Sequence, residues 1–173
     1  TIGPIRDAFD GILPQSDIRV WNAPGPTRET HPRNRLFRDV AERMREAFLL
    51  AQQPDVVLIT SLFEGLADDA ITSIGRFDRT TPTAVILYDL IPLLTPDEPY
   101  QTSTLHRDYY QRKLSSLKRA RLLLAISDSA KREAHTALNF SEQDVVNISC
   151  AYDASFRPLE LTDALRQDVR RRE

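Results

Sequence analysis

The chain has 173 residues, which suits one domain and is too short for two complete ones. Hydrophobic residues make up 41% and charged residues 28%, so the composition is that of a globular protein and excludes a disordered or collagen-like chain. The 23 lysines and arginines nearly balance the 25 aspartates and glutamates, giving a net charge of −2. No overall positive field draws the molecule to nucleic acid, which we exclude as a partner.

A single cysteine, Cys150, excludes an internal disulfide and favours a reducing compartment, so we expect a cytoplasmic protein. We expect Cys150 itself to be a small buried residue at a strand end. No apolar run approaches the roughly 20 residues that span a bilayer, and no signal peptide opens the chain. The chain starts at Thr1 without a methionine and ends in the charged residues 170–173, so we expect a fragment of a longer protein.

The first third of the chain is predicted to hold two helices and a weak strand. Apolar residues keep helical spacing over 5–13, and a short apolar segment at 17–21 predicts the strand. A proline-rich loop follows at 22–34. The spacing from 37 to 51 then predicts the second helix, which Pro54 ends.

The rest of the chain contains four short, continuously apolar runs, as expected for strands that are covered on both faces of a parallel sheet. They occupy residues 56–59, 83–87, 122–126 and 145–148. Helical patterns separate them at 66–74, 104–120 and 129–138, the last capped by Ser127 or Ser129. The alternation predicts an α/β fold in which the four runs are parallel neighbours joined by right-handed crossovers. We expect residues 55–60 and 83–87 to be buried on both faces.

A ligand site is expected at the carboxyl ends of these strands, because loops and helix N-termini converge at that edge of a parallel sheet. The residues that follow the strands there are Thr60, Ser61, Glu64, Gly65, Tyr88, Asp89, Ser127, Asp128 and residues 149–153. For Ser127 and Asp128, capping of the following helix is the competing interpretation. For Glu64, a functional and a structural role are equally open.

Asp89 is the leading candidate, because it directly follows an apolar strand and precedes the apolar residues 90–93. A carboxylate among apolar neighbours must be hydrogen-bonded or functional. The competing interpretation is an aspartate that holds the loop by accepting backbone N–H groups. Tyr88 beside it is either a packed aromatic residue or a substrate contact.

The sequence lacks the motifs of nucleotide-binding, hydrolase and metal sites. The five glycines cannot form G-x-G-x-x-G or the phosphate loop G-x-x-x-x-G-K-S/T, and no G-x-S-x-G elbow occurs. The three histidines, His31, His106 and His135, are far apart and lack a second ligand at metal-binding spacing. We therefore expect no metal and no cofactor.

The predicted helix at 104–120 is basic. Its cations are Arg107, Arg112, Lys113, Lys118 and Arg119, interleaved with apolar residues. A basic amphipathic helix can lie on an anionic membrane, which would place the protein at the inner face of the membrane. The competing interpretation is a solvated face over an ordinary core stripe.

Five segments occur in an order that resembles the N-terminal domain of a family 4 (group 1) glycosyltransferase. They are Pro-Asp-Val-Val at 54–57, Thr-Ala-Val-Ile-Leu-Tyr-Asp-Leu-Ile-Pro-Leu at 83–93, the pair of tyrosines opening 109–117, Leu-Leu-Ala-Ile-Ser-Asp-Ser-Ala-Lys-Arg at 123–132 and Tyr-Asp-Ala-Ser-Phe-Arg-Pro at 152–158. The resemblance implies the N-terminal half of a GT-B fold, in which two Rossmann-like domains face a cleft. Residues 1–158 would be the acceptor-side domain, and residues 159–173 the start of a linker or helix toward an absent C-terminal domain.

The resemblance also implies site residues. Asp89 matches the family's cleft aspartate, and Tyr88 stands where many members have a histidine near the donor sugar. Gly3 falls at the family's glycine-rich loop. The paired glutamates E-x7-E that bind the donor belong to the absent domain. With the residues from the strand ends, this predicts Asp89 as catalytic and Gly3, Glu64, Gly65, Tyr88, Ser127 and Tyr152 as substrate-binding.

The implied activity is that of a retaining, metal-independent glycosyltransferase of polysaccharide biosynthesis. It would transfer a sugar from a nucleotide-sugar donor, bound mainly by the absent domain, to a glycan or lipid-linked acceptor, and the fragment alone would be inactive. The alternative is a non-enzymatic α/β module that binds a small ligand or a protein. A continuation beyond Glu173 with a second βα array and the paired glutamates would favour the enzyme.

Overall fold

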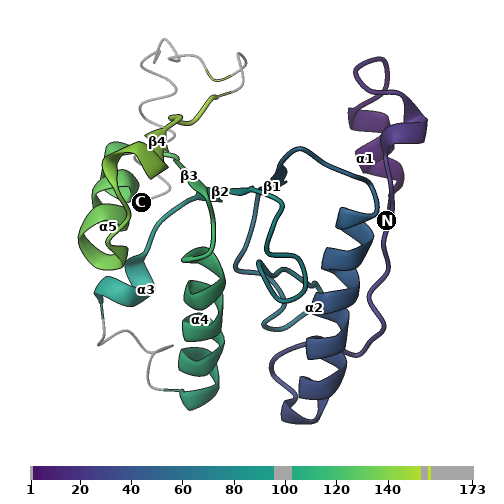
Figure 1. The fold of residues 1–173 in the computed structure, drawn as a ribbon, viewed down its shortest axis with the longest axis horizontal. Helices are drawn as coiled ribbons and strands as arrows, with labels where there is room; N and C mark the ends of the chain where they lie inside the picture. The colour runs from purple at the N-terminus through teal and green to yellow at the C-terminus, as the bar shows by residue number, and fades with distance from the viewer. Residues whose placement is uncertain (1, 96–102, 153–155, 157–173) are drawn as a thin grey trace, which may run out of the picture.

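A computed structural model describes residues 2–95, 103–152 and 156 (Figure 1). The linker or helix predicted at 159–173 lies outside these residues. The described part contains a four-stranded sheet with the order β1-β2-β3-β4. Its strands are β1 (Val57–Ile59), β2 (Thr83–Leu87), β3 (Leu122–Ala125) and β4 (Val145–Asn147). All three neighbouring pairs are parallel, which confirms the predicted α/β fold and the four parallel neighbours.

Helices precede and connect the strands. They are α1 (Gly3–Ala8), α2 (Arg35–Leu50), α3 (Ile91–Leu94), α4 (Thr104–Leu117) and α5 (Asp128–Leu138), with 3-10 turns at Gln15–Asp17, Pro32–Asn34 and Glu142–Asp144. The helices predicted at 5–13, 37–51, 104–120 and 129–138 are confirmed as α1, α2, α4 and α5, with α1 shorter than expected. Ser127 caps α5 by accepting the N–H of Ala130 at 3.1 Å.

Two predicted elements are wrong. Residues 18–21 form no strand, because no neighbouring strand in the described chain offers them a hydrogen-bond ladder. Residues 66–74 form no helix, although their apolar spacing allows one. Their polar groups bind other segments instead. The carboxylate of Asp69 accepts the N–H of Thr27 at 2.8 Å, and the hydroxyl of Ser73 donates to Glu46 at 2.6 Å.

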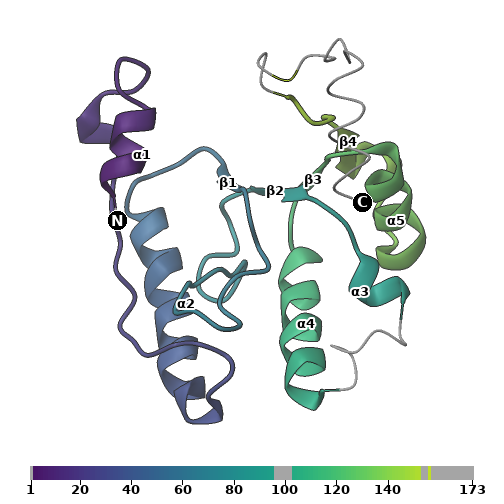
Figure 2. The ribbon, with the colours of Figure 1, turned by 180° about the vertical axis from the view of Figure 1, so that it is seen from behind.

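The hydrophobic core lies on one face of the sheet. Side chains alternate between the two faces of a strand, and the residues that share the core face are Ile59, Val85, Leu87, Leu123, Ala125 and Val145, each at most 4% exposed. They pack against apolar residues of α4 and α5. Figures 1 and 2 show α2, α4 and α5 on this same side of the sheet. Right-handed crossovers between strands in sequential order place the connecting helices α4 and α5 on the same side.

The expected two-sided burial of residues 55–60 is wrong. Val56 is 56% exposed and Leu58 is 51% exposed, because β1 is an edge strand of the described sheet and its crossovers cover one face. The predicted burial on both faces holds better for residues 83–87. Every residue there is buried except Ile86, which is half-buried.

Helix α2 turns its charged face inward. Amphipathic helices usually bury the apolar face, but here Phe37, Val40 and Met44 are exposed. The charged residues Arg38, Glu42 and Glu46 are buried in their place.

The buried carboxylate of Glu42 and the neighbouring carboxylate of Glu29 are paired with arginines. Arg112 of α4 bridges Glu42 of α2 and Glu29 of the preceding loop. Arg38 pairs with Glu29 at 3.0 Å, and Arg76 pairs with Glu42 at 3.1 Å. Breaking a buried pair by removing one partner leaves an uncompensated charge, which costs about 3–5 kcal/mol. These pairs therefore hold α2 and α4 together across the long β1–β2 connection.

Lys113 is the most deeply buried cation beside this cluster. Its Nζ donates to the carbonyl oxygen of Thr72 at 2.9 Å and lies 5.7 Å from the ring centre of Tyr109. Burial, together with the neighbouring Arg112, lowers the pKa of Lys113 to about 7, against the opposing attraction of Glu42 and Glu29. Taking an ammonium group out of water disfavours its charged form.

We predict that the stability of the domain rises with pH above neutrality and that Lys113→Met removes this rise. Folded Lys113 loses its proton near pH 7 whereas the unfolded side chain keeps it to about 10.5, so the unfolded state binds more protons between these values. The free energy of unfolding should therefore increase by at most about 1.4 kcal/mol per pH unit in that window. Urea unfolding at pH 7 to 10 measures the slope.

The matched control is Lys118→Met, which removes an exposed lysine at the end of the same helix. Its pH dependence should equal that of the unmodified chain. An unchanged slope in Lys113→Met would show that Lys113 is not the group responsible.

Candidate functional site

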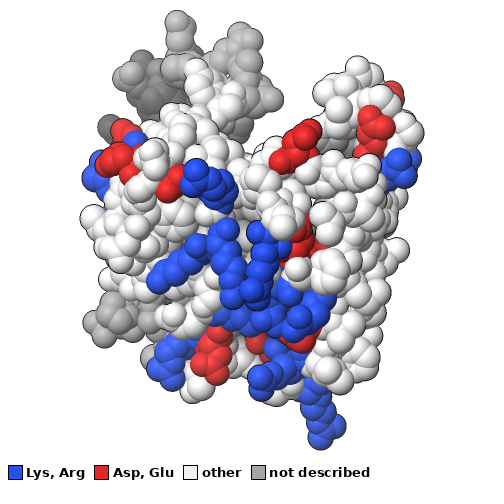
Figure 3. Space-filling view, in the orientation of Figure 1, with Lys and Arg blue, Asp and Glu red and all other residues white. Residues whose placement is uncertain are grey.

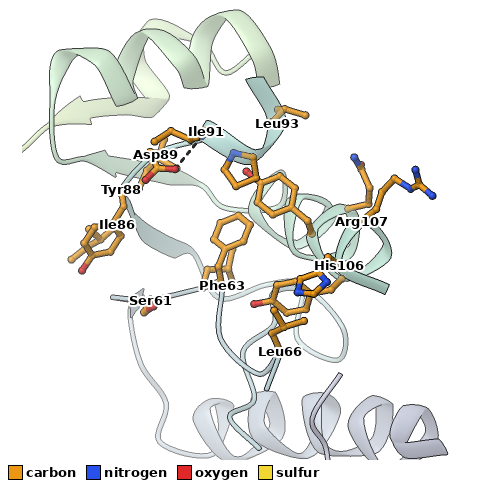
Figure 4. A pocket seen from close by; sticks show the side chains of 16 residues that line it. Ser61, Phe63, Leu66, Ile86, Tyr88, Asp89, Ile91, Leu93, His106 and Arg107 are labelled. Atoms are coloured by element: carbon orange, nitrogen blue, oxygen red, sulfur yellow. Dashed lines mark hydrogen bonds between the residues drawn. The ribbon is translucent and has the colours of Figure 1, made fainter. Parts of the chain in front are cut away.

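A cavity of about 640 Å³ lies at the carboxyl ends of β1 and β2, where the sequence predicts a ligand site. Its walls come from the loop after β1, the end of β2, α3 and the first turns of α4 (Figure 4). Residues from these walls include Ser61, Phe63, Tyr88, Asp89, His106 and Tyr110. A concave, mostly apolar site with a few polar groups is the usual form of a small-molecule site.

Aromatic rings form the middle of the cavity. The rings of Phe63 and Tyr110 lie 5.1 Å apart between centres, at an angle of 30°. Figure 4 shows Phe63 pointing inward, with Tyr88 on one side of it and His106 on the other. Most of the residues that line the cavity are apolar or aromatic, so its surface offers a ligand more contact with carbon atoms than hydrogen bonds.

Asp89 both lines the cavity and holds its loop. Its Oδ1 accepts the N–H of Ile91 at 3.0 Å, at the start of α3. The loop-anchor interpretation therefore has direct support, and the exposure of the carboxylate also leaves it accessible to a ligand. The next residue, Leu90, is fully buried and donates its N–H to Glu133 of α5 at 2.9 Å. Hydrogen bonds from the two residues that follow Asp89 thus fix the turn that carries it.

Among the predicted site residues, Tyr88 and Asp89 line the cavity, together with Ser61. The others, Gly3, Glu64, Gly65, Ser127 and Tyr152, are not among its lining residues. Gly3 is exposed at the start of α1, and Tyr152 is 80% exposed after β4.

The remaining candidates make hydrogen bonds within the domain. Glu64 accepts the hydroxyl of Ser61 at 2.6 Å, and its carbonyl oxygen accepts the hydroxyl of Tyr109 at 3.2 Å. The capping interpretation of Ser127 is confirmed. Asp128 accepts the side-chain amide of Asn147 at 2.7 Å and so connects α5 to β4.

Sequence reasoning missed Phe63, His106 and Glu133. Phe63 follows β1 among the expected polar residues, but an apolar residue there carries no signal of a site. The Nδ1 atom of His106 is buried at the cavity without a hydrogen-bond partner in the described residues, and a lone histidine gave no reason to expect this. Nothing in the sequence around Glu133 distinguishes it from a solvent-exposed glutamate of a helix, although it accepts the N–H of Leu90.

Among the described residues, no cluster of three or more histidine, cysteine or acidic residues could hold a metal ion. Cys150 is exposed, so its expected burial is wrong: it lies just beyond the last described strand, where no helix covers it. No helix in the described ranges is long and apolar enough to cross a membrane.

Comparison with known proteins relates the chain to one enzyme. Three Escherichia coli proteins, each a "Serotype-specific mannosyltransferase WbdA", are 30% identical to it over 159 residues. The similarity covers 92% of this chain but 19% of each relative, so the chain spans about a fifth of their length. No family model and no solved structure matches the chain. The chain is homologous to a segment of a glycosyltransferase.

We predict that Gly65→Ala destabilises the domain without removing a ligand contact. Gly65 has φ +89°, and an added Cβ would collide with the backbone carbonyl oxygen of Ala70. An alanine at positive φ is strained, and this contact with the backbone adds to the cost, so we expect a loss of more than about 1 kcal/mol in the free energy of unfolding. Chemical denaturation measures it.

Gly11→Ala is the matched control, because Gly11 has φ +70° but nothing within 4 Å of the added Cβ. We expect Gly11→Ala to lose less free energy of unfolding, because it carries only the strain of the positive φ. The difference between the two variants is then the cost of the contact with Ala70. Equal losses in the two variants would contradict the packing role given to Gly65.

Proposed function

We propose that this chain is the acceptor-side domain of a retaining glycosyltransferase with a GT-B architecture. The enzyme transfers a sugar, mannose by analogy with the relatives, from a nucleotide-sugar donor to a glycan or lipid-linked acceptor. The observation that carries the proposal is the similarity to mannosyltransferases over 92% of the chain. The cavity at the ends of β1 and β2 supports it, because a ligand site at this edge is what the fold offers.

The residues of the cavity suit the binding of an acceptor. Sugar rings and other flat or apolar groups can rest on Phe63 and Tyr110, whose rings lie side by side. Asp89 then accepts a hydrogen bond from a hydroxyl group and orients it toward the donor, and Tyr88 lies beside it. Orientation and a fixed negative charge are the means of catalysis that these side chains can supply.

Asp89→Asn in the whole enzyme tests this role. Asparagine keeps an oxygen that can accept the Ile91 N–H, so the free energy of unfolding should change by less than about 1 kcal/mol. Loss of a charged contact made in the transition state should lower the rate of sugar transfer by about a hundredfold to a thousandfold. Transfer of labelled mannose from a nucleotide-activated donor measures the rate.

The matched control is Asp128→Asn, which alters the aspartate that follows β3 and is not among the residues lining the cavity. It should leave the transfer rate within about twofold of the unmodified enzyme, because surface changes away from a site have small effects. If Asp89→Asn unfolds the domain while its folded fraction transfers sugar normally, Asp89 is a loop anchor only.

A second experiment tests where the donor binds. The chain lacks the closely spaced glycines that bring backbone N–H groups to a phosphate. We predict that the 173-residue chain shows no micromolar binding of a nucleotide sugar in calorimetry, since the donor is held mainly by another domain. Micromolar binding would show that the donor site is within this chain.

A further inference from the structure

A second cavity, of about 350 Å³, lies beside the second half of α2. Its walls come from the segment at 19–23, from α2 and from residues 69–71 of the β1–β2 connection. Figures 1 and 2 both show the extended segment between α1 and α2 running beside α2. The cavity shares no lining residue with the one at the ends of β1 and β2. Its volume is within the range of small-molecule sites.

Arg45 lines this cavity as a cation without a partner. Its side chain is half-buried, and its Nη1 atom is buried with no hydrogen-bond partner among the described residues. Burial lowers the pKa of Arg45, and the charge of the neighbouring Glu46 opposes this shift. The carboxylate of Glu46, however, accepts the hydroxyl of Ser73 and the N–H of Asp78. Because a guanidinium group stays protonated, Arg45 lacks the anion that a charge withdrawn from water normally has beside it.

Other arginines near α2 do have anionic partners. Figure 3 shows cationic side chains gathered over α4 and between α4 and α2, with acidic side chains among them. Arg112 pairs with Glu29. Arg43, two residues before Arg45, pairs with Asp39 at 3.2 Å. Arg45 is therefore an exception in a region where carboxylates accompany the arginines.

The other polar side chains of the cavity offer donors as well. Arg19 is exposed and forms no ion pair in the described residues, and the indole N–H of Trp21 has no hydrogen-bond partner there. Asp69 also lines the cavity, but it is already occupied. It accepts the backbone N–H groups of Thr27 and Arg28 at 2.8 Å and 3.0 Å. The hydrogen bond from the Arg28 guanidinium, together with these backbone bonds, lowers the pKa of Asp69 to about 2.

We propose that this cavity binds a small ring compound that carries a phosphate or carboxylate group. The oxygens of such a group accept N–H groups of Arg19 and Arg45, because planar guanidinium groups match phosphate and carboxylate in geometry. Trp21 and Phe48 supply apolar surface on which the ring packs. The bound anion is then the missing charge partner of Arg45.

The described chain does not supply this anion itself. Asp69 is bound by Arg28, and Asp17, which is close to Arg19 in sequence, accepts the hydroxyl of Ser16. The chain that follows β4 starts at the opposite edge of the sheet from α2 (Figure 1). A free ligand is the occupant that this arrangement favours.

Calorimetry on the protein as its gene encodes it, in a phosphate-free buffer, tests the proposal. The probes are glucose 6-phosphate and glucuronate, which carry the two anionic groups, with glucose as the uncharged control. We expect at least one charged probe to bind at least about tenfold more tightly than glucose, because hydrogen bonds to charged groups are the strong ones. The tighter of the two charged probes identifies the anionic group.

Variants locate the binding. Arg19→Gln and Arg45→Gln should each weaken binding of the charged probe by about tenfold or more, because each removes a charged donor. Trp21→Ala should weaken binding of the ring-bearing probe but leave the affinity for inorganic phosphate within about twofold. The matched control is Arg43→Gln, which alters an arginine of the same helix that pairs with Asp39 and is not among the lining residues. Its affinity for the charged probe should stay within about twofold of the unmodified protein.

Three results would overturn the proposal. Glucose binding as tightly as both charged probes would show that no anion is recognised. Absence of binding by both charged probes would show that the cavity is closed or filled in the whole protein. An affinity that Arg19→Gln and Arg45→Gln leave unchanged would place the ligand elsewhere. Circular dichroism confirms that each variant is folded, and the exposed, unpaired Arg19 keeps the test decisive should Arg45→Gln fail to fold.

Discussion

Arg112 pairs with two carboxylates at once, Glu29 and Glu42, and the rest of the site depends on this interaction. It attaches α4 to α2 and to the loop before α2. Because β1 and β2 are joined by a connection without regular structure, no helix packing fixes that connection to the sheet. The ion pairs and the hydrogen bonds of Glu46 and Asp69 do so instead. The aromatic residues of α4 are thereby held against the loop that carries Phe63.

The crossovers of the sheet decide where the cavity can form. The described helices that connect consecutive strands lie on one side of the sheet, and α3 and α4 lie beside the carboxyl ends of β1 and β2. This side has a dense core, in which Leu90 is fully buried directly after the candidate aspartate. A buried neighbour and the bond from Ile91 together give Asp89 a fixed position. A fixed acidic group beside an aromatic cavity is consistent with the acceptor-binding role that we propose.

The candidate site was predictable in part. The edge of the sheet, Tyr88 and Asp89 follow from the strand pattern, because parallel strands present their carboxyl ends together. Glu64 and Ser127 satisfied the same rule, yet the structure uses both for hydrogen bonds within the domain. Phe63 and His106 reach the cavity from segments whose direction depends on packing. A pattern of residue types contains no information about that direction.

The sequence by itself determined the four strands, their parallel order, the principal helices and the edge where a ligand would bind, since these follow from local hydrophobic periodicity and the handedness of crossovers. Only the tertiary structure decided the path of residues 60–82 and the orientation of α2. Periodicity identifies the apolar face of a helix but not the partner it meets. Buried pairs such as Arg112 with Glu42 join residues far apart in the chain, so charged side chains took the inward face of α2.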